Sequence, residues 1–256
     1  MILDKKYIQS FITNNQVIED DKTILKPVEY RWTHGATDFH MGDGLIIYSI
    51  IQYMRAKVCV CLGSGGGFIP RIMTQARVDL YDTEIFEGNR DFNWGDIGTT
   101  FIVDAANKVG GNVDWLPEDS FFRKIFSPRI INETTEKAYY DFFVKEDIKI
   151  DYLHIDAGHS YEDVKQDFEL YSSLLSEHGI ISIHDTDIRY AENYIVTKDI
   201  SDQKHHDDFA NGPARFINEL GGCECSGNKW QRFDLFNEGT FPKKPSSTGL
   251  TLLRRG

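Results

Sequence analysis

Two strand-like segments of the sequence end in aspartate residues, and a histidine follows one of them. The segment IDYLHID ends at Asp156, with His159 three residues later, and the segment GIISIHDTD supplies Asp185 and Asp187. In open α/β sheets, ligands bind outside the carboxyl ends of the strands, so these side chains stand where chemistry is expected. Two such strand ends indicate either a shared cation or an acid–base pair. The alternative interpretation is that the acids cap the helices that follow them.

A glycine-rich turn precedes these segments in the chain. Residues 63–67 read Gly-Ser-Gly-Gly-Gly, between a strand-like run and a predicted helix. Glycine permits a tight turn and the close approach of a ligand, and the N–H groups at a helix start suit a polar ligand. Asp82 closes the next predicted strand, 19 positions after Gly63, which is the spacing that holds ribose hydroxyls. Phe68 stands where the dinucleotide fingerprint needs glycine or alanine, so the pattern favours an adenosyl cofactor without a pyrophosphate.

The elements that must position these residues alternate along the chain. Such alternation predicts an α/β fold with a single Rossmann-like, doubly wound, mainly parallel sheet. The last two strands have no helix between them, which predicts a C-terminal antiparallel hairpin. Residues 1–37 are predicted to form an N-terminal arm, helical around residues 5–12, and residues 38–256 one domain. The predicted strands are 57–62, 78–82, 112–116, 151–156, 179–185, 230–236 and 249–255, and the predicted helices are 42–55, 68–76, 101–109, 138–146, 160–175 and 212–220.

The bulk composition limits the classes of partner. The chain of 256 residues carries a net charge of −12, which disfavours binding to nucleic acid or to a membrane surface. A small neutral or glycan-like acceptor fits better. The sequence contains no apolar run of about 20 residues and begins without a secretory pattern, so we expect a cytoplasmic protein. The four cysteines are interpreted as buried reduced thiols rather than as a zinc site.

Taken together, these motifs resemble the class I S-adenosylmethionine-dependent methyltransferases, and most closely their metal-dependent small-molecule O-methyltransferases. The segments that carry the resemblance are CLGSGGG, HIDAGHSYEDVKQD, GIISIHD and the closing GLTLLRR, within residues 38–256. The resemblance implies that the glycine turn binds the methionine end of the cofactor, that Asp82 binds the ribose and that the segment after the third strand faces the adenine. The implied cofactor-binding residues are Gly63, Ser64, Gly65, Gly67, Asp82, Asp119 and Ser120.

The resemblance also implies a metal site and a base. Asp156 and Asp185 fall at the metal-binding acids, with Thr186 or Asp187 completing the set, and carboxylate ligation favours Mg²⁺. His159 takes the place of the lysine that acts as general base in catechol-type relatives; the alternative is a histidine at a helix start that contacts backbone. Two positions depart from the family pattern: Cys61 replaces the acid that ends the first strand, and Thr186 replaces an asparagine.

The expected activity is therefore methyl transfer to a hydroxyl group of a small molecule, for example a sugar. A homo-oligomer is among the assemblies that we expect. His184 is interpreted as a buried strand residue. Residues 186–211 are predicted to form a long loop, either solvated or acting as a lid over the acceptor. Two other functions stay open: a nicotinamide-dependent nucleotide-sugar oxidoreductase, and a cofactor-binding protein without turnover.

Overall fold

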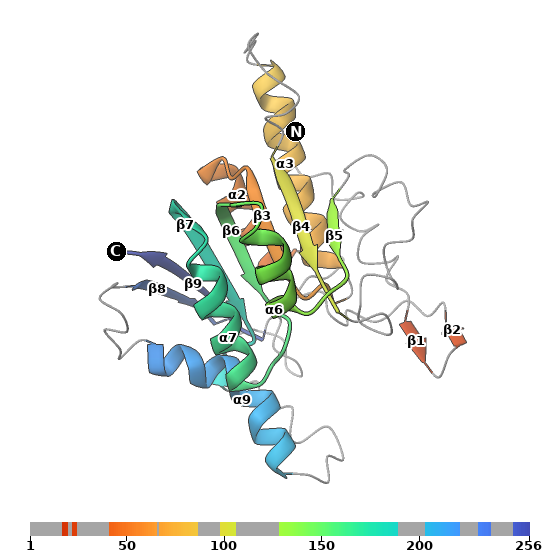
Figure 1. Cartoon of the computed structure of the whole chain (residues 1–256), viewed down its shortest axis with the longest axis vertical. Helices are drawn as coiled ribbons and strands as arrows, with labels where there is room; N and C mark the ends of the chain where they lie inside the picture. Colours follow the sequence, from red (N-terminus) through yellow and green to blue (C-terminus); the bar gives the residue numbers. More distant parts are fainter. Residues whose placement is uncertain are drawn as a thin grey trace. The chain divides into compact units, whose positions relative to one another are not determined.

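The computed structural model describes most of the regular elements of the chain. It covers residues 17–19, 22–24, 41–65, 67–86, 98–105, 128–188, 203–220, 230–236 and 248–256, with the backbone alone for 17–19, 22–24, 81–86 and 203–211. The chain divides into two compact units, residues 1–134 and 135–256, which are described separately below. Figure 1 labels their helices and strands. The predicted helix at residues 5–12 lies outside the described residues.

The first unit contains three parallel strands in the order β5-β4-β3. They are β3 (Val58–Leu62), β4 (Thr99–Val103) and β5 (Arg129–Ile131), and Val60 of β3 lies opposite Phe101 of β4. Because the strands are parallel, β3 and β4 end at the same edge. A separate antiparallel pair is formed by β1 (Val17–Glu19) and β2 (Lys22–Ile24).

Two helices of this unit pack against each other. They are α2 (Asp43–Met54) and α3 (Phe68–Phe86). Helix α2 buries Ile47, Tyr48 and Ile51, which lie on one face of a helix of 3.6 residues per turn. The hydroxyl of Tyr48 donates to Asp79 of α3 at 2.7 Å. Burial and the neighbouring carboxylate raise the pKa of Tyr48, so this hydroxyl stays protonated and fixes the two helices together.

Two predicted elements of this unit are wrong. The predicted strand 78–82 belongs to α3, and the predicted helix 101–109 begins instead as strand β4. The helical pattern of buried residues that starts at Ile69 continues through Met73 and Ala76. After Pro70, in the first turn, no glycine or proline interrupts it before residue 78, so the helix continues through residues 78–82. Arg77 donates to the backbone oxygen of Gly98 and to the hydroxyl of Thr100, which ties α3 to β4. The predicted strand 112–116 lies outside the described residues, and β5 was not predicted.

The second unit has four strands in the order β6-β7-β9-β8. Strands β6 and β7 are parallel, whereas β9 runs antiparallel to both β7 and β8. Together with the parallel strands of the first unit, these pairings confirm the predicted α/β class with a mainly parallel sheet and an antiparallel C-terminal hairpin. The strands are β6 (Ile150–Ile155), β7 (Leu175–His184), β8 (Trp230–Leu235) and β9 (Leu250–Arg255), and the helices are α6 (Thr135–Ala138), the π-helix η2 (Tyr139–Phe143), α7 (Tyr161–Ser172) and α9 (Gln203–Leu220).

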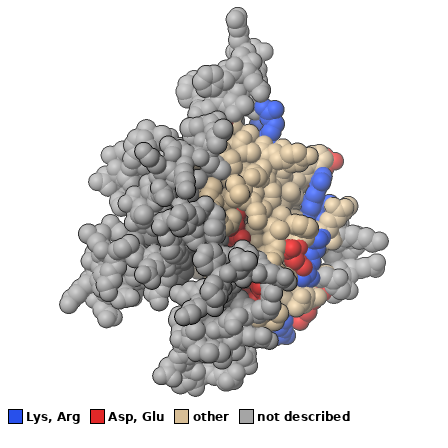
Figure 2. Space-filling view, turned by 180° about the vertical axis from the view of Figure 1, so that it is seen from behind, with Lys and Arg blue, Asp and Glu red and all other residues tan. Residues whose placement is uncertain are grey.

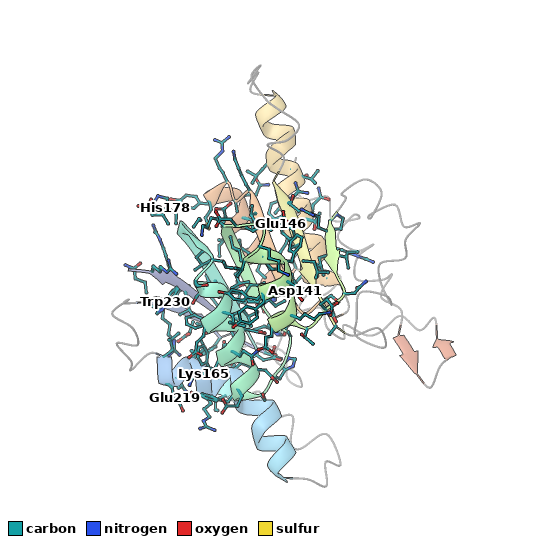
Figure 3. All side chains as sticks on the ribbon, viewed as in Figure 1. Asp141, Glu146, Lys165, His178, Glu219 and Trp230 are labelled. Atoms are coloured by element: carbon teal, nitrogen blue, oxygen red, sulfur yellow. The ribbon has the colours of Figure 1, made fainter. Side chains whose placement is uncertain are left out.

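Helices α7 and α9 pack through aromatic rings. The ring of Phe168 in α7 lies 5.1 Å from that of Phe216 in α9 and 5.1 Å from that of Trp230 in β8. Lys165, Glu219 and Trp230 are labelled in this part of Figure 3. Helix α9 begins at Gln203, so the prediction of an irregular loop over 186–211 is wrong for residues 203–211. Residues 189–202 lie outside the described part of the chain.

The described surface carries charges of both signs. On the face shown in Figure 2, basic and acidic side chains lie among uncharged ones rather than in one broad basic area. None of the helices among the described residues combines the length and the apolar character that crossing a bilayer requires.

Candidate functional site

The glycine turn after β3 has a backbone that requires glycine. Gly63, Gly65 and Gly67 have φ values of 81°, 46° and 83°, in the left-handed region that side chains disfavour. The N–H of Gly63 donates to the carbonyl of Val103 at 2.9 Å, and the N–H of Gly67 donates to the carbonyl of Ser64 at 2.8 Å. These bonds hold the turn between the end of β3 and the start of α3, as the sequence indicates.

The acid that accompanies this turn is Asp104, which the sequence analysis did not select. Asp104 directly follows β4 and is buried, and its carboxylate accepts hydrogen bonds from the backbone N–H and the hydroxyl of Ser64. The predicted position of Asp82 at a strand end is wrong, because residue 82 lies within α3. The run TTFIV before Asp104, rich in β-branched residues, is the signal from which the correct strand could have been predicted.

Other cofactor-binding predictions fall on residues that the structure does not describe. Asp119 and Ser120 lie in the segment 106–127, and their role stays a prediction. Cys61, which replaces the family's acid at this strand, is buried, and its thiol donates to the carbonyl of Gly63 at 3.1 Å. Its side chain therefore supports the turn itself.

In the second unit, Asp156 follows β6 and does not cap the next helix. The N-cap of α7 is Ser160, whose hydroxyl accepts from the N–H of Asp163 at 3.1 Å. The capping interpretation is therefore wrong for Asp156. Its carboxylate is instead turned toward the end of the neighbouring strand β7.

Four side chains meet where β6 and β7 end. His159 Nε2 lies 2.9 Å from Asp185 Oδ2 and 3.5 Å from Asp156 Oδ1. His184 Nδ1 lies 3.3 Å from Asp156 Oδ1 and 3.1 Å from Asp185 Oδ1. Three of these residues, Asp156, His184 and Asp185, offer donor atoms within 4.8 Å of one another, a spacing that suits a divalent cation. We call these three residues the Asp-His-Asp cluster.

The charges in this group perturb one another. Burial alone lowers the pKa of His159, but its hydrogen bonds to Asp156 and Asp185 and their negative charges outweigh burial and raise that pKa well above its ordinary value. Burial raises the pKa of Asp185, but the neighbouring charge of His184 and the hydrogen bond from His159 hold it below its ordinary range. The carboxylates therefore favour a positive charge beside them.

The two remaining predicted metal ligands are Thr186 and Asp187. Thr186 is buried, and its hydroxyl accepts a hydrogen bond from Thr251 of β9 at 2.9 Å. Asp187 is also buried, its N–H donates to the carbonyl of Thr248 at 3.1 Å, and it is not a member of the Asp-His-Asp cluster. Their assignment as ligands stays a prediction.

His184 takes part in the cluster because the backbone turns at Asp185. Successive side chains of a strand point to opposite faces, so a strand that continued would separate residues 184 and 185. Asp185 has a φ of 58°, which breaks this alternation and lets both side chains point to Asp156. Sequence periodicity placed His184 inside the strand and gave no signal for this turn.

Helix α9 packs directly against the loop that carries His159. A Cβ atom at Gly212 would lie 2.1 Å from the carbonyl oxygen of His159 and 2.5 Å from the N of Tyr161. Tyr161 also donates to Glu219 of α9, and its ring lies under the guanidinium of Arg215 at 4.6 Å. The glycine thus permits a close approach that fixes the position of the loop.

Comparison with known proteins finds a family match over about half of the chain. Residues 61–186 match a family described as a methyltransferase domain, from the end of β3 to the residue after Asp185. A curated relative, an uncharacterized protein of Sinorhizobium fredii called y4gI, is 39% identical over 61 residues, which is 24% of this chain and 6% of that protein. The match therefore spans only a small part of that relative.

Two solved structures share the fold. An O-methyltransferase from Bacillus cereus, solved in complex with SAH, aligns over 100% of this chain and 93% of its own with a TM-score of 0.62 and 14% identity. The O-methyltransferase TomG of Streptomyces achromogenes, involved in tomaymycin synthesis and solved with SAM, aligns over 100% and 99% with a TM-score of 0.53 and 11% identity. At these identities the comparison shows the fold, a sheet that is mostly parallel with antiparallel C-terminal strands.

Proposed function

We propose that this chain is an S-adenosylmethionine-dependent O-methyltransferase that acts on a hydroxyl group of a small molecule. The proposal is supported by the match of residues 61–186 to a family described as a methyltransferase domain and by the fold shared with solved O-methyltransferases. The observation that carries the proposal is the group formed by Asp156, His159 and Asp185, which offers a base beside a charged carboxylate pair. A sugar or another polyhydroxylated compound is the acceptor class that we favour, since the chain is acidic overall.

The donor is assigned to the glycine turn of the first unit. The left-handed glycines have no side chain that would block a ligand. We assign the ribose hydroxyls to the carboxylate of Asp104, because it lies beside this turn, where it accepts hydrogen bonds from Ser64. The ligands named for the two solved structures, SAH and SAM, support an adenosyl donor.

The reaction is an in-line displacement. The acceptor oxygen forms a bond to the methyl carbon while the carbon–sulfur bond breaks, and its electron pair stays on sulfur, which becomes the thioether of S-adenosylhomocysteine. The proton of the acceptor hydroxyl passes to Nε2 of His159, in its neutral form. Correct orientation of the two reactants supplies several kcal/mol of the barrier, and a positioned base about 10²–10⁴-fold in rate.

A divalent cation fits the donor atoms of Asp156, His184 and Asp185. Such an ion, when bound, lowers the pKa of an acceptor hydroxyl and orients its oxygen. The cation would also take the place of His159 beside the carboxylates of Asp156 and Asp185. The imidazole of His159 would then be available to accept the proton of the acceptor hydroxyl.

Calorimetry with S-adenosylmethionine, S-adenosylhomocysteine and NAD⁺ tests the cofactor. We expect heat of binding with the first two compounds and none with NAD⁺. Binding of NAD⁺ alone would favour the oxidoreductase, and binding of the adenosyl compounds without methyl transfer to any of a panel of sugars, catechols and other hydroxylated acceptors would favour a binding protein without turnover.

A second experiment tests the dependence on metal. Methyl transfer is measured with and without EDTA, and for Asp156→Ala and Asp185→Ala. We expect transfer to be lost while calorimetric affinity for the donor stays within about threefold. Asp141→Ala removes an exposed carboxylate of η2 (Figure 3) and serves as the matched control. Transfer that survives EDTA and both substitutions would exclude a role for metal.

A further inference from the structure

The geometry of His184 is that of a metal ligand. Its Nδ1 lies 3.1 Å from an oxygen of Asp185 and 3.3 Å from an oxygen of Asp156. Adjacent ligands of an octahedral ion, each about 2.1 Å from the metal, are about 3 Å apart. The two distances from His184 therefore match the spacing of neighbouring ligands, and the donor atoms of all three residues of the Asp-His-Asp cluster lie within 4.8 Å of one another.

A second contact orients the imidazole. Nε2 of His184 lies 2.8 Å from the hydroxyl oxygen of Thr248. When that oxygen accepts from Nε2–H, the lone pair of Nδ1 faces the carboxylates, and histidines that bind metals commonly hold their second nitrogen in this way. Thr248 is itself fixed, because its carbonyl accepts from the N–H of Asp187 at 3.1 Å. The next residue, Gly249, has a φ of 96° and packs on the backbone of Asp187, so this hydroxyl has a defined position.

The backbone supports the same assignment. The left-handed conformation of Asp185 is uncommon for a residue with a side chain. Its structural consequence is that the side chains of residues 184 and 185 both lie in the Asp-His-Asp cluster. Thr186, which follows them, uses its hydroxyl to accept from Thr251.

We propose that His184 is the third protein ligand of the cation held by Asp156 and Asp185, and that the site selects a first-row transition metal over Mg²⁺. Magnesium takes oxygen ligands, whereas an imidazole nitrogen favours the transition metals, for which affinity rises in the order Mn²⁺, Fe²⁺, Co²⁺, Ni²⁺. The role of this metal in methyl transfer rests on the proposed function, but metal binding itself is measurable without methyl donor or acceptor. It replaces the Mg²⁺ expected from the sequence, because that expectation counted only oxygen ligands.

The test measures binding of Mn²⁺, Co²⁺ and Mg²⁺ to the full chain by calorimetry, with the protein freed of metal. In the parent we expect Co²⁺ to bind at least tenfold more tightly than Mg²⁺. His184→Asn should reduce Co²⁺ affinity at least tenfold and Mg²⁺ affinity less than threefold. The control His178→Asn changes an exposed histidine of the same strand, six residues before His184 (Figure 3), and should change neither affinity.

Pulsed electron paramagnetic resonance of bound Mn²⁺ gives a direct readout. We expect nitrogen modulation from an imidazole in the parent, in His178→Asn and in His159→Gln, and its loss in His184→Asn. Loss in His159→Gln with retention in His184→Asn would assign the nitrogen to His159 and overturn the proposal. Modulation absent from the parent, or no metal binding at all, would overturn it as well.

Two further measurements separate the possible failures. Thr248→Val removes the hydroxyl that holds Nε2 and should weaken Co²⁺ binding about tenfold or more, which tests the assignment if His184→Asn does not fold. Donor binding is measured separately by calorimetry. A chain that binds S-adenosylmethionine but holds metal through oxygens alone overturns this inference only, and a chain that binds metal through His184 but not the donor overturns the proposed function only.

Discussion

Ser64 donates two hydrogen bonds to the same carboxylate oxygen of Asp104, one from its backbone N–H at 2.8 Å and one from its hydroxyl at 2.5 Å. The pair joins the glycine turn after β3 to the residue that follows β4. Both partners are buried. The contact therefore fixes the turn and holds a negative charge beside it.

Asp104→Asn should weaken donor binding while the turn stays formed. An asparagine oxygen still accepts from Ser64, but the charge that strengthens hydrogen bonds to ribose hydroxyls is lost. A charge-assisted hydrogen bond contributes about 1.5–3 kcal/mol, so we expect an increase in Kd for S-adenosylmethionine of about 10- to 100-fold by calorimetry. Asp82→Asn, the position favoured by sequence spacing, should bind like the parent. The opposite result for the two variants would reassign the ribose contact to Asp82.

His159→Gln should slow methyl transfer about 10²–10⁴-fold, with donor affinity unchanged. Glutamine keeps a polar side chain of similar length but cannot take a proton near neutral pH. The rate constant is measured in a single turnover, with the enzyme in excess over a limiting amount of donor and with the acceptor at saturating concentration, so that binding and product release do not obscure it. A loss below tenfold would assign His159 to another role, such as holding the two carboxylates in the metal-free protein.

The sequence predicted the second unit well because its signals are local. Strands β6 and β7 are apolar runs that end in polar turns. Helix α7 is preceded by its N-cap Ser160, a residue type common at that position. In the first unit the same reasoning failed between residues 78 and 104. The run at 78–82 has β-branched and aromatic residues, but it continues an established helix, and β4 was mistaken for a helix because its apolar residues are followed by alanines.

The site could be predicted only in part for a related reason. Asp156, His159 and Asp185 follow strand ends, which are visible in a sequence. Asp104 was missed because its strand was missed. His184 was missed because its participation depends on one backbone angle, the φ of 58° at Asp185, and on a hydroxyl 64 positions away at Thr248. Neither leaves a local pattern.

Gly212→Ala should impair the enzyme through the position of His159. The added Cβ would lie 2.1 Å from the carbonyl oxygen of His159, a backbone atom that cannot move without the whole loop. We expect a loss of about 1–3 kcal/mol in the free energy of unfolding in urea, and a lower rate with unchanged donor affinity. Asn218→Ala, at an exposed position of the same helix, should stay within about 0.5 kcal/mol of the parent. An equal effect of the two variants would show that the close contact with the loop is unimportant.

Asp167 should make the stability of the protein depend on pH. This residue of α7 is 3% exposed, and burial, assisted by the negative charge of Asp163, raises its pKa to about 7, although a hydrogen bond from Thr135 opposes the rise. In the unfolded chain the pKa is about 3.9. Between these values the folded state holds a proton that the unfolded state has released, so the stabilisation is complete below about pH 4 and is lost as the pH rises to about 7.

Asp167→Asn has a side chain of the same shape that cannot ionise, so it should remove this dependence. At about pH 3.5 the free energies of unfolding of parent and variant should be similar, and at pH 8 the variant should be the more stable by about 2–4 kcal/mol. Urea denaturation at both pH values measures the difference between the free energies of unfolding of variant and parent. The titration of all other groups is common to the two proteins and cancels in this difference. Glu169→Gln, an exposed acid on the same helix, should follow the parent at both pH values. Parallel curves for Asp167→Asn and the parent would mean that Asp167 is ionised in the folded protein at neutral pH without penalty, and that its burial is compensated by the hydrogen bond from Thr135.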